Sequence, residues 1–233
     1  MILLIAINSI YAQENKLYQK GITAEQNLKD VIGLTPYSTG GMGFDTRYEG
    51  IKGSPRIYDT LLSSYLKING KEEYLKLATD IDAVSNTLLF NHPKTGKLLG
   101  IPASMVSEVV INKDGKDLIY RTDEGRKFDK SVKDNKFFQV LLEIPYLFIK
   151  MPVKTFTEAD YKGAYSSDRR YDEYETIYRY YILTSNGTYH KIQLSKKSLV
   201  KLFPSKKDLI NNFPVDGSYA NDEEMIKAII GKL

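Results

Sequence analysis

The side chains of this 233-residue chain that could perform chemistry are mostly carboxylates. Asp80 and Asp82 lie two residues apart, so a strand would point both carboxylates to one face. Such a pair could bind a hard cation or perform acid–base catalysis. The alternative, which we favour, is the polar end of a strand as it enters a turn, because aspartate is depleted inside strands.

Other reactive groups are few. The chain has no cysteine, which excludes disulfides, thiolate metal sites, thiol nucleophiles and the lipid-modified cysteine of a lipoprotein. Its two histidines, His92 and His190, cannot form a multi-histidine centre, and neither has a partner at a known catalytic spacing. Gly41-Met42-Gly43 lacks the Lys-Ser/Thr ending of a phosphate-binding loop. We therefore predict no catalytic residue, no metal site, no cofactor and no nucleotide.

Tyrosine recurs among arginine and acidic residues between positions 161 and 181. Tyrosine and arginine are enriched at recognition surfaces because they combine large contact area with hydrogen bonding. The alternative is that these tyrosines form cross-strand pairs on a half-exposed sheet. The candidate binding residues are Tyr165, Arg169, Arg170, Tyr171 and Tyr174.

A basic cluster follows this segment and comprises Lys191, Lys196, Lys197, Lys201, Lys206 and Lys207. It could contact anionic lipid headgroups or an acidic polysaccharide. The alternative is a solvated face of short amphipathic helices. The net charge of +4 is too small to indicate a nucleic-acid partner. A protein, glycan or lipid surface is the expected partner.

The pattern from residue 56 to residue 194 is a succession of short strands separated by tight turns. Asn69-Gly70 and Asn186-Gly187 are typical hairpin turns. Tight turns imply antiparallel neighbours, so a sandwich and a partly open barrel both fit. Residues 195–233 change to a helical period, with Asn221 as a helix cap. The sequence predicts a mainly β fold, an antiparallel sheet with short C-terminal helices packed on it.

The first residues predict export. Met1–Ala12 reads MILLIAINSIYA and precedes polar Gln13, and an apolar run, a small residue and a polar switch form the layout of a signal peptide. No Lys or Arg precedes the run, which an upstream start codon would explain, and a buried strand is the alternative. No later stretch has about 18 uninterrupted apolar residues, so we expect no transmembrane segment in the mature chain. The expected location is periplasmic or secreted.

The expected organisation has four parts. They are a signal peptide (1–12), an N-terminal helix and Gly/Ser-rich linker (13–55), an antiparallel β domain (56–194) and a C-terminal helical appendage of the same domain (195–233).

Three segments carry a resemblance. They are Gly53-Ser54-Pro55, Phe156-Thr157-Glu158-Ala159-Asp160, and residues 194–207. In this order they resemble a group of uncharacterised exported proteins from the Bacteroidota, over about residues 53–233. The resemblance implies export and an envelope setting, and it implies no catalytic residue.

The favoured function is a non-catalytic binding or structural role in the cell envelope or outside the cell. The alternative is a carboxylate-dependent hydrolase or lyase that acts on an envelope polymer. Asp80, Asp82, Glu143 and the stretch 168–175 would supply its carboxylates. Two buried carboxylates about 5 to 10 Å apart in a cleft would favour the enzyme.

Overall fold

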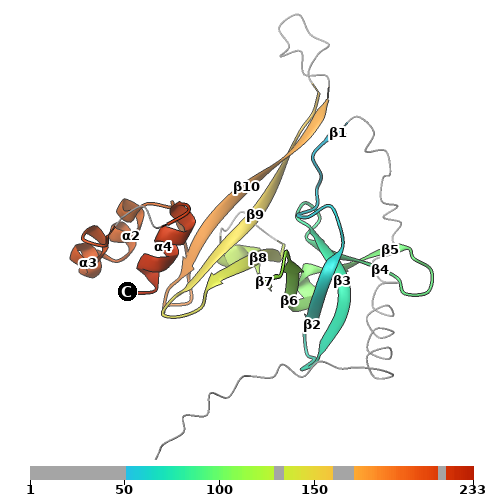
Figure 1. Cartoon of the computed structure of the whole chain (residues 1–233), viewed down its shortest axis with the longest axis horizontal. Coiled ribbons are helices and arrows are strands. Elements are labelled where there is room, and N and C mark those ends of the chain that lie inside the picture. The colour runs from blue at the N-terminus through green and yellow to red at the C-terminus, as the bar shows by residue number, and fades with distance from the viewer. Residues whose placement is uncertain (1–50, 129–133, 160–170, 215–218) are drawn as a thin grey trace, which may run out of the picture.

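The computed structural model describes residues 51–128, 134–159, 171–214 and 219–233. These residues form a mainly β fold, an 11-stranded sheet with short C-terminal helices, as the sequence predicts (Figure 1). The sheet is mixed, because the first strand pairs in parallel and all other pairings are antiparallel. It is not closed into a barrel. All the described strands belong to this one sheet.

The strands follow one another mostly as hairpins. They are β1 (Ile51–Lys52), β2 (Leu62–Ile68), β3 (Tyr74–Asp82), β4 (Thr87–Asn91), β5 (Leu98–Pro102), β6 (Val106–Lys113), β7 (Lys116–Asp123), β8 (Lys136–Leu142), β9 (Leu147–Thr157), β10 (Asp172–Leu183) and β11 (Tyr189–Ile192). Their order in the sheet is β1-β10-β9-β8-β7-β6-β2-β3-β4-β5, and β11 also pairs with β10. Gly70 and Gly187, at the two predicted hairpin turns, have φ of 76°, which confirms both turns.

Among the described residues, the helices lie near the C-terminus, apart from two short turns. They are α2 (Lys196–Leu202), α3 (Lys207–Asn211) and α4 (Asp222–Ile230), with 3₁₀ turns at Ala103–Met105, Gly125–Lys127 and Pro204–Lys206. Ser195 caps α2 and Asn221 caps α4, since each side chain accepts a hydrogen bond from the backbone N–H three residues later. Within the described ranges, every helix falls short of the length and apolar character that a membrane span requires.

One segment near the start of the described chain draws two distant parts of the sheet together. We call residues 53–61 the strap. Before the strap, β1 pairs with the first residues of β10; within the strap, the Ile57 N–H donates to the Ile81 carbonyl of β3 at 2.9 Å. Gly53 makes this path possible, because a Cβ there would lie 2.4 Å from the Tyr174 carbonyl oxygen. The strap therefore connects β10 to β3. We call the face of the sheet that carries the two larger apolar clusters the inner face, and the opposite face the outer face.

The inner face carries two apolar clusters. One packs between strands β2 to β8, and its buried members include Leu66, Phe90, Val109 and Ile111. The other lies where the helices pack on β9 and β10, and it centres on Phe148 and the α4 residues Ile226, Ile229 and Ile230. Between the two clusters the inner face is polar, and the candidate site lies there.

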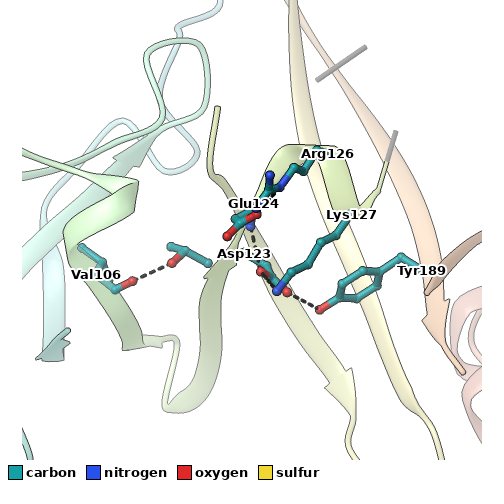
Figure 2. A network of polar contacts seen from close by, with 7 residues as sticks. Val106, Asp123, Glu124, Arg126, Lys127 and Tyr189 are labelled. Carbon is teal, nitrogen blue, oxygen red and sulfur yellow. Dashed lines mark hydrogen bonds and ion pairs between the residues drawn. The ribbon is translucent and has the colours of Figure 1, made fainter. Parts of the chain in front are cut away.

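The outer face carries a smaller cluster, in which Phe128 stacks on Tyr189 with ring centroids 4.1 Å apart. A polar network borders this cluster (Figure 2). The Asp123 carboxylate accepts from Lys127 Nζ at 2.6 Å and from the Tyr189 hydroxyl at 3.3 Å. Burial raises the pKa of Tyr189, and Asp123 raises it further, so the hydroxyl stays protonated and remains a donor. This contact ties the end of β7 to β11.

Candidate functional site

A cleft of about 280 Å³ opens on the inner face between the strap and α4. Its base is a row of residues that the sheet register places side by side, Tyr120 of β7, Gln139 of β8 and Lys150 of β9. Tyr58 of the strap and Tyr178 of β10 add two more aromatic rings. Lys113 of β6 and Glu223 of α4 complete the lining, so seven separate segments contribute to the cleft, and its walls combine aromatic rings with polar groups.

Tyr58 and Tyr120 form a hydroxyl pair in this cleft. Their hydroxyl oxygens lie 2.5 Å apart, and the rings meet edge to face at an interplanar angle of 85°. Burial raises the pKa of both hydroxyls, so both are neutral at physiological pH. When one hydroxyl donates to the other, the second keeps its own proton as a donor for a ligand.

Glu223 of α4 fixes the wall of the cleft. Its carboxylate lies 2.8 Å from Lys150 Nζ and accepts a hydrogen bond of 2.7 Å from the Tyr180 hydroxyl. Lys150 also lies over the Tyr178 ring, with Nζ 4.4 Å from the centroid. Two side chains of the sheet thus hold the first turn of α4, and the charge of Lys150 is neutralised by Glu223.

Lys113 supplies a second cation, at the rim of the cleft. Its Nζ lies 5.2 Å from the centre of the Tyr58 ring. Within the described part of the chain, no carboxylate lies at ion-pair distance from this ammonium. The Lys113 ammonium is therefore available to an anionic ligand that enters the cleft.

The paired aspartates do not form a cation site. Asp80 is fully buried and accepts from Arg56 Nε at 2.8 Å, from the Tyr58 N–H at 3.1 Å and from the Ile81 N–H at 2.7 Å. It anchors the strap to β3. The Oδ1 atom of Asp82 accepts from the N–H groups two and three residues later, both at 2.9 Å. Asp82 thus caps a turn at the end of β3, in agreement with the favoured interpretation, whereas Asp80 is buried within β3 and departs from it.

Other candidate groups have structural partners. His92 Nδ1 accepts backbone N–H bonds of 3.1 and 3.2 Å within its own turn. His190 lies on β11 opposite Ile182. Glu143 pairs with Arg121 at 2.5 Å. Among the described residues there is no group of three or more side chains suited to hold a metal ion.

The predicted binding residues lie elsewhere. Tyr165, Arg169 and Arg170 fall outside the described residues. Tyr171 packs under Lys52, whose Nζ lies 3.3 Å from the ring centroid, and Tyr174 packs against the Phe156 ring at 4.8 Å. Both tyrosines lie at the β1 end of β10 and do not line the cleft.

The residues that line the cleft carry no local sequence signal. Tyr58 and Tyr120, for example, are separated by 62 positions, and only the fold brings them together. The alternation of side chains along β10 is a partial sequence signal for the cleft, because it places Tyr174, Tyr178 and Tyr180 on one face of the sheet.

Comparison with protein-family models finds no match, and comparisons with curated proteins and with solved structures find none either. The resemblance to exported Bacteroidota proteins therefore stays a prediction. The function has to be inferred from the cleft and the strands around it.

Proposed function

We propose that this chain is an exported, non-catalytic binding protein whose cleft holds an acidic sugar unit of a glycan. The observation that carries the proposal is that tyrosine rings, hydroxyl donors and the available Lys113 ammonium share one cleft. The place of action is the periplasm or the outside of the cell.

Each part of the cleft matches a part of such a ligand. The rings of Tyr58 and Tyr178 offer apolar surface to the C–H face of a sugar ring, and their polar ends stay hydrated. The Tyr120 hydroxyl and the Gln139 amide can exchange hydrogen bonds with sugar hydroxyls. Lys113 can bind the carboxylate of an acidic sugar. The volume of about 280 Å³ is at the small end for ligand sites and suits a short unit of a chain.

The arrangement of carboxylates supports binding rather than hydrolysis. Glycoside hydrolases of the common type need two carboxyl groups on either side of the scissile bond. Of the described residues that line this cleft, Glu223 alone carries a carboxylate, and Lys150 and Tyr180 hold it. Asp80 is occupied by Arg56 and two backbone N–H groups. The carboxylate-dependent hydrolase or lyase is therefore the less favoured function.

Binding of a galacturonic acid trisaccharide, measured by isothermal titration calorimetry, tests the proposal. The neutral galactose trisaccharide is the comparison ligand and should bind more weakly. Lys113→Ala should weaken binding of the acidic trisaccharide about tenfold, the value of one charged hydrogen bond. Tyr178→Ala should weaken both ligands, because it removes a stacking ring.

Lys116→Ala is the matched control, since Lys116 pairs with Lys113 across the β6–β7 turn but does not line the cleft. This control should leave both affinities unchanged. If the acidic trisaccharide does not bind, or binds equally well to the Lys113→Ala variant, the proposed function is wrong.

The proposed export can be tested separately from the proposed binding. When the whole chain is expressed in a bacterium with a cell envelope, the mature protein should lack residues 1–12, because the apolar run and Ala12 match the substrate of a signal peptidase. Intact mass measurement of protein from the periplasmic and cytoplasmic fractions checks this. Full-length protein confined to the cytoplasm would contradict export.

A further inference from the structure

The outer edge of β10 has an opening. On one side, β10 pairs with β9 from Glu173 to Leu183. On the other side, β1 pairs with residues 172–173 and β11 with residues 180–183. On that second side Gly53 lies against the Tyr174 carbonyl, and within the described part of the chain residues 175–179 have no strand partner there. The N–H and C=O groups of residues 175–179 that point away from β9 therefore lie between two short strands without a described strand partner.

The opening also exposes apolar surface. Ile177 is 49% exposed and Tyr178 is 47% exposed, although both lie in the middle of a long strand. An unpaired strand edge with exposed apolar side chains is a template for another strand. Extended peptides bind other domains by adding a strand at such edges, and side chains at alternate positions give the specificity.

The side chains of this edge define what the added strand should carry. Because side chains alternate, Glu175, Ile177 and Arg179 project from the outer face. In the described ranges, Glu175 and Arg179 form no ion pair. Opposite charges and paired apolar residues on neighbouring strands stabilise a sheet. The matching side chains are therefore acidic opposite Arg179, apolar opposite Ile177 and basic opposite Glu175.

We propose that an extended segment of a partner protein adds to β10 in the opening between β1 and β11. The segment alternates an acidic, a β-branched apolar and a basic residue with small polar residues. Backbone hydrogen bonds to residues 175–179 hold it, and Glu175, Ile177 and Arg179 select it.

The length of the opening argues against a second copy of β10 as the occupant. β10 has 12 residues in one continuous strand. The five strand residues of the opening span about 17 Å, and β1 with Gly53 on one side and β11 on the other occupy the edge around them. A second β10 would collide with these strands, whereas a short segment fits.

This interaction goes beyond the proposed glycan binding and selects its ligand through different side chains. The selecting residues lie on the outer face, whereas Lys113 borders the cleft on the inner face. A variant at one site should therefore leave the other intact, and the two proposals can fail separately.

Fluorescence polarisation with labelled peptides tests the interaction. The first peptide reads Thr-Glu-Thr-Val-Thr-Lys-Thr from its N-terminus and suits antiparallel addition; the second has Glu and Lys exchanged and suits parallel addition. One peptide should bind and the other should bind at least tenfold more weakly. Amide hydrogen exchange of residues 175–179 should slow when the preferred peptide is added, which reports addition to the backbone.

Charge exchange on the protein sharpens the test. The double variant Glu175→Arg with Arg179→Glu should reverse the preference between the two peptides, while Lys116→Glu and Lys113→Ala should leave it unchanged. Circular dichroism checks that each variant is folded. Binding of neither peptide, or equal binding of both to every variant, overturns the proposal. Concentration-dependent dimers that the double variant abolishes, without peptide binding, would assign the edge to a second copy instead.

Discussion

Replacement of Phe148 by alanine is expected to lower the free energy of unfolding by about 4 kcal/mol, the usual cost of truncating a fully buried phenylalanine. Phe148 is 0% exposed and lies between β9 and the helices. Its ring stacks on Tyr180 at 6.0 Å, and Tyr180 in turn donates to Glu223. Chemical denaturation followed by circular dichroism measures the change.

Phe156 provides a matched control on the same strand. It lies on the same face of β9 as Phe148, but it is 44% exposed. Phe156→Ala should therefore cost about 1 kcal/mol or less, as partly exposed side chains usually do. Equal losses in the two variants would mean that the helices are not held through Phe148.

The same substitution should disturb the cleft. The pairing of Glu223 with Lys150 depends on the position of α4, which packs on Phe148. Without the ring, α4 is held less firmly and Lys150 loses a fixed partner. We therefore expect Phe148→Ala to weaken trisaccharide binding at temperatures where the variant is still folded, whereas Phe156→Ala should not.

The elements of this fold were predictable because their signals are local. The hairpin turn at Asn186-Gly187 and the cap at Asn221 depend on neighbouring residues alone, and the structure has both. Strand alternation likewise gives the faces of β10. Such features need no knowledge of the rest of the chain.

The cleft was not predictable, because its residues meet only through long-range pairing. The density of tyrosine and arginine directed attention to Tyr171 and Tyr174, whereas Tyr178, on the same strand, is the one that lines the cleft. The sequence analysis did not predict the path of the strap across the sheet. Residues 53–55 read as a linker, and the contacts of Asp80 with Arg56 and Tyr58 explain why the segment is instead fixed across the sheet.

Asp80 anchors the strap, and Asp80→Ala is expected to lower the free energy of unfolding by about 3 kcal/mol. The change removes a buried ionic partner and leaves two backbone N–H groups without an acceptor. Arg56 is 24% exposed and can turn to water, so the loss falls at the low end for a broken buried pair. Asp80→Asn should cost less, because the amide oxygen can still accept from both N–H groups.

The pH dependence of stability distinguishes the charge of Asp80 from its hydrogen bonds. Burial raises the pKa of this carboxyl by more than the backbone N–H groups and Arg56 lower it. Between the ordinary value of 3.8 and the raised value, the folded protein binds more protons than the unfolded chain. The part of the stability that depends on protonation of Asp80 is therefore full below 3.8 and is lost as pH rises through the folded pKa, whereas the contacts of its carboxylate remain above it.

The wild type should accordingly gain stability relative to Asp80→Asn as pH falls through this window, because asparagine does not titrate. Denaturation of both proteins at a series of pH values measures the difference. Asp117→Asn is the control, since Asp117 is exposed and its variant should follow the wild type. A difference in the free energy of unfolding between wild type and Asp80→Asn that does not change with pH would mean that Asp80 has the same pKa in the folded and the unfolded protein. Its contacts with Arg56 and the backbone would then offset the loss of hydration. The strap would then be fixed by an ion pair that carries no net penalty of burial.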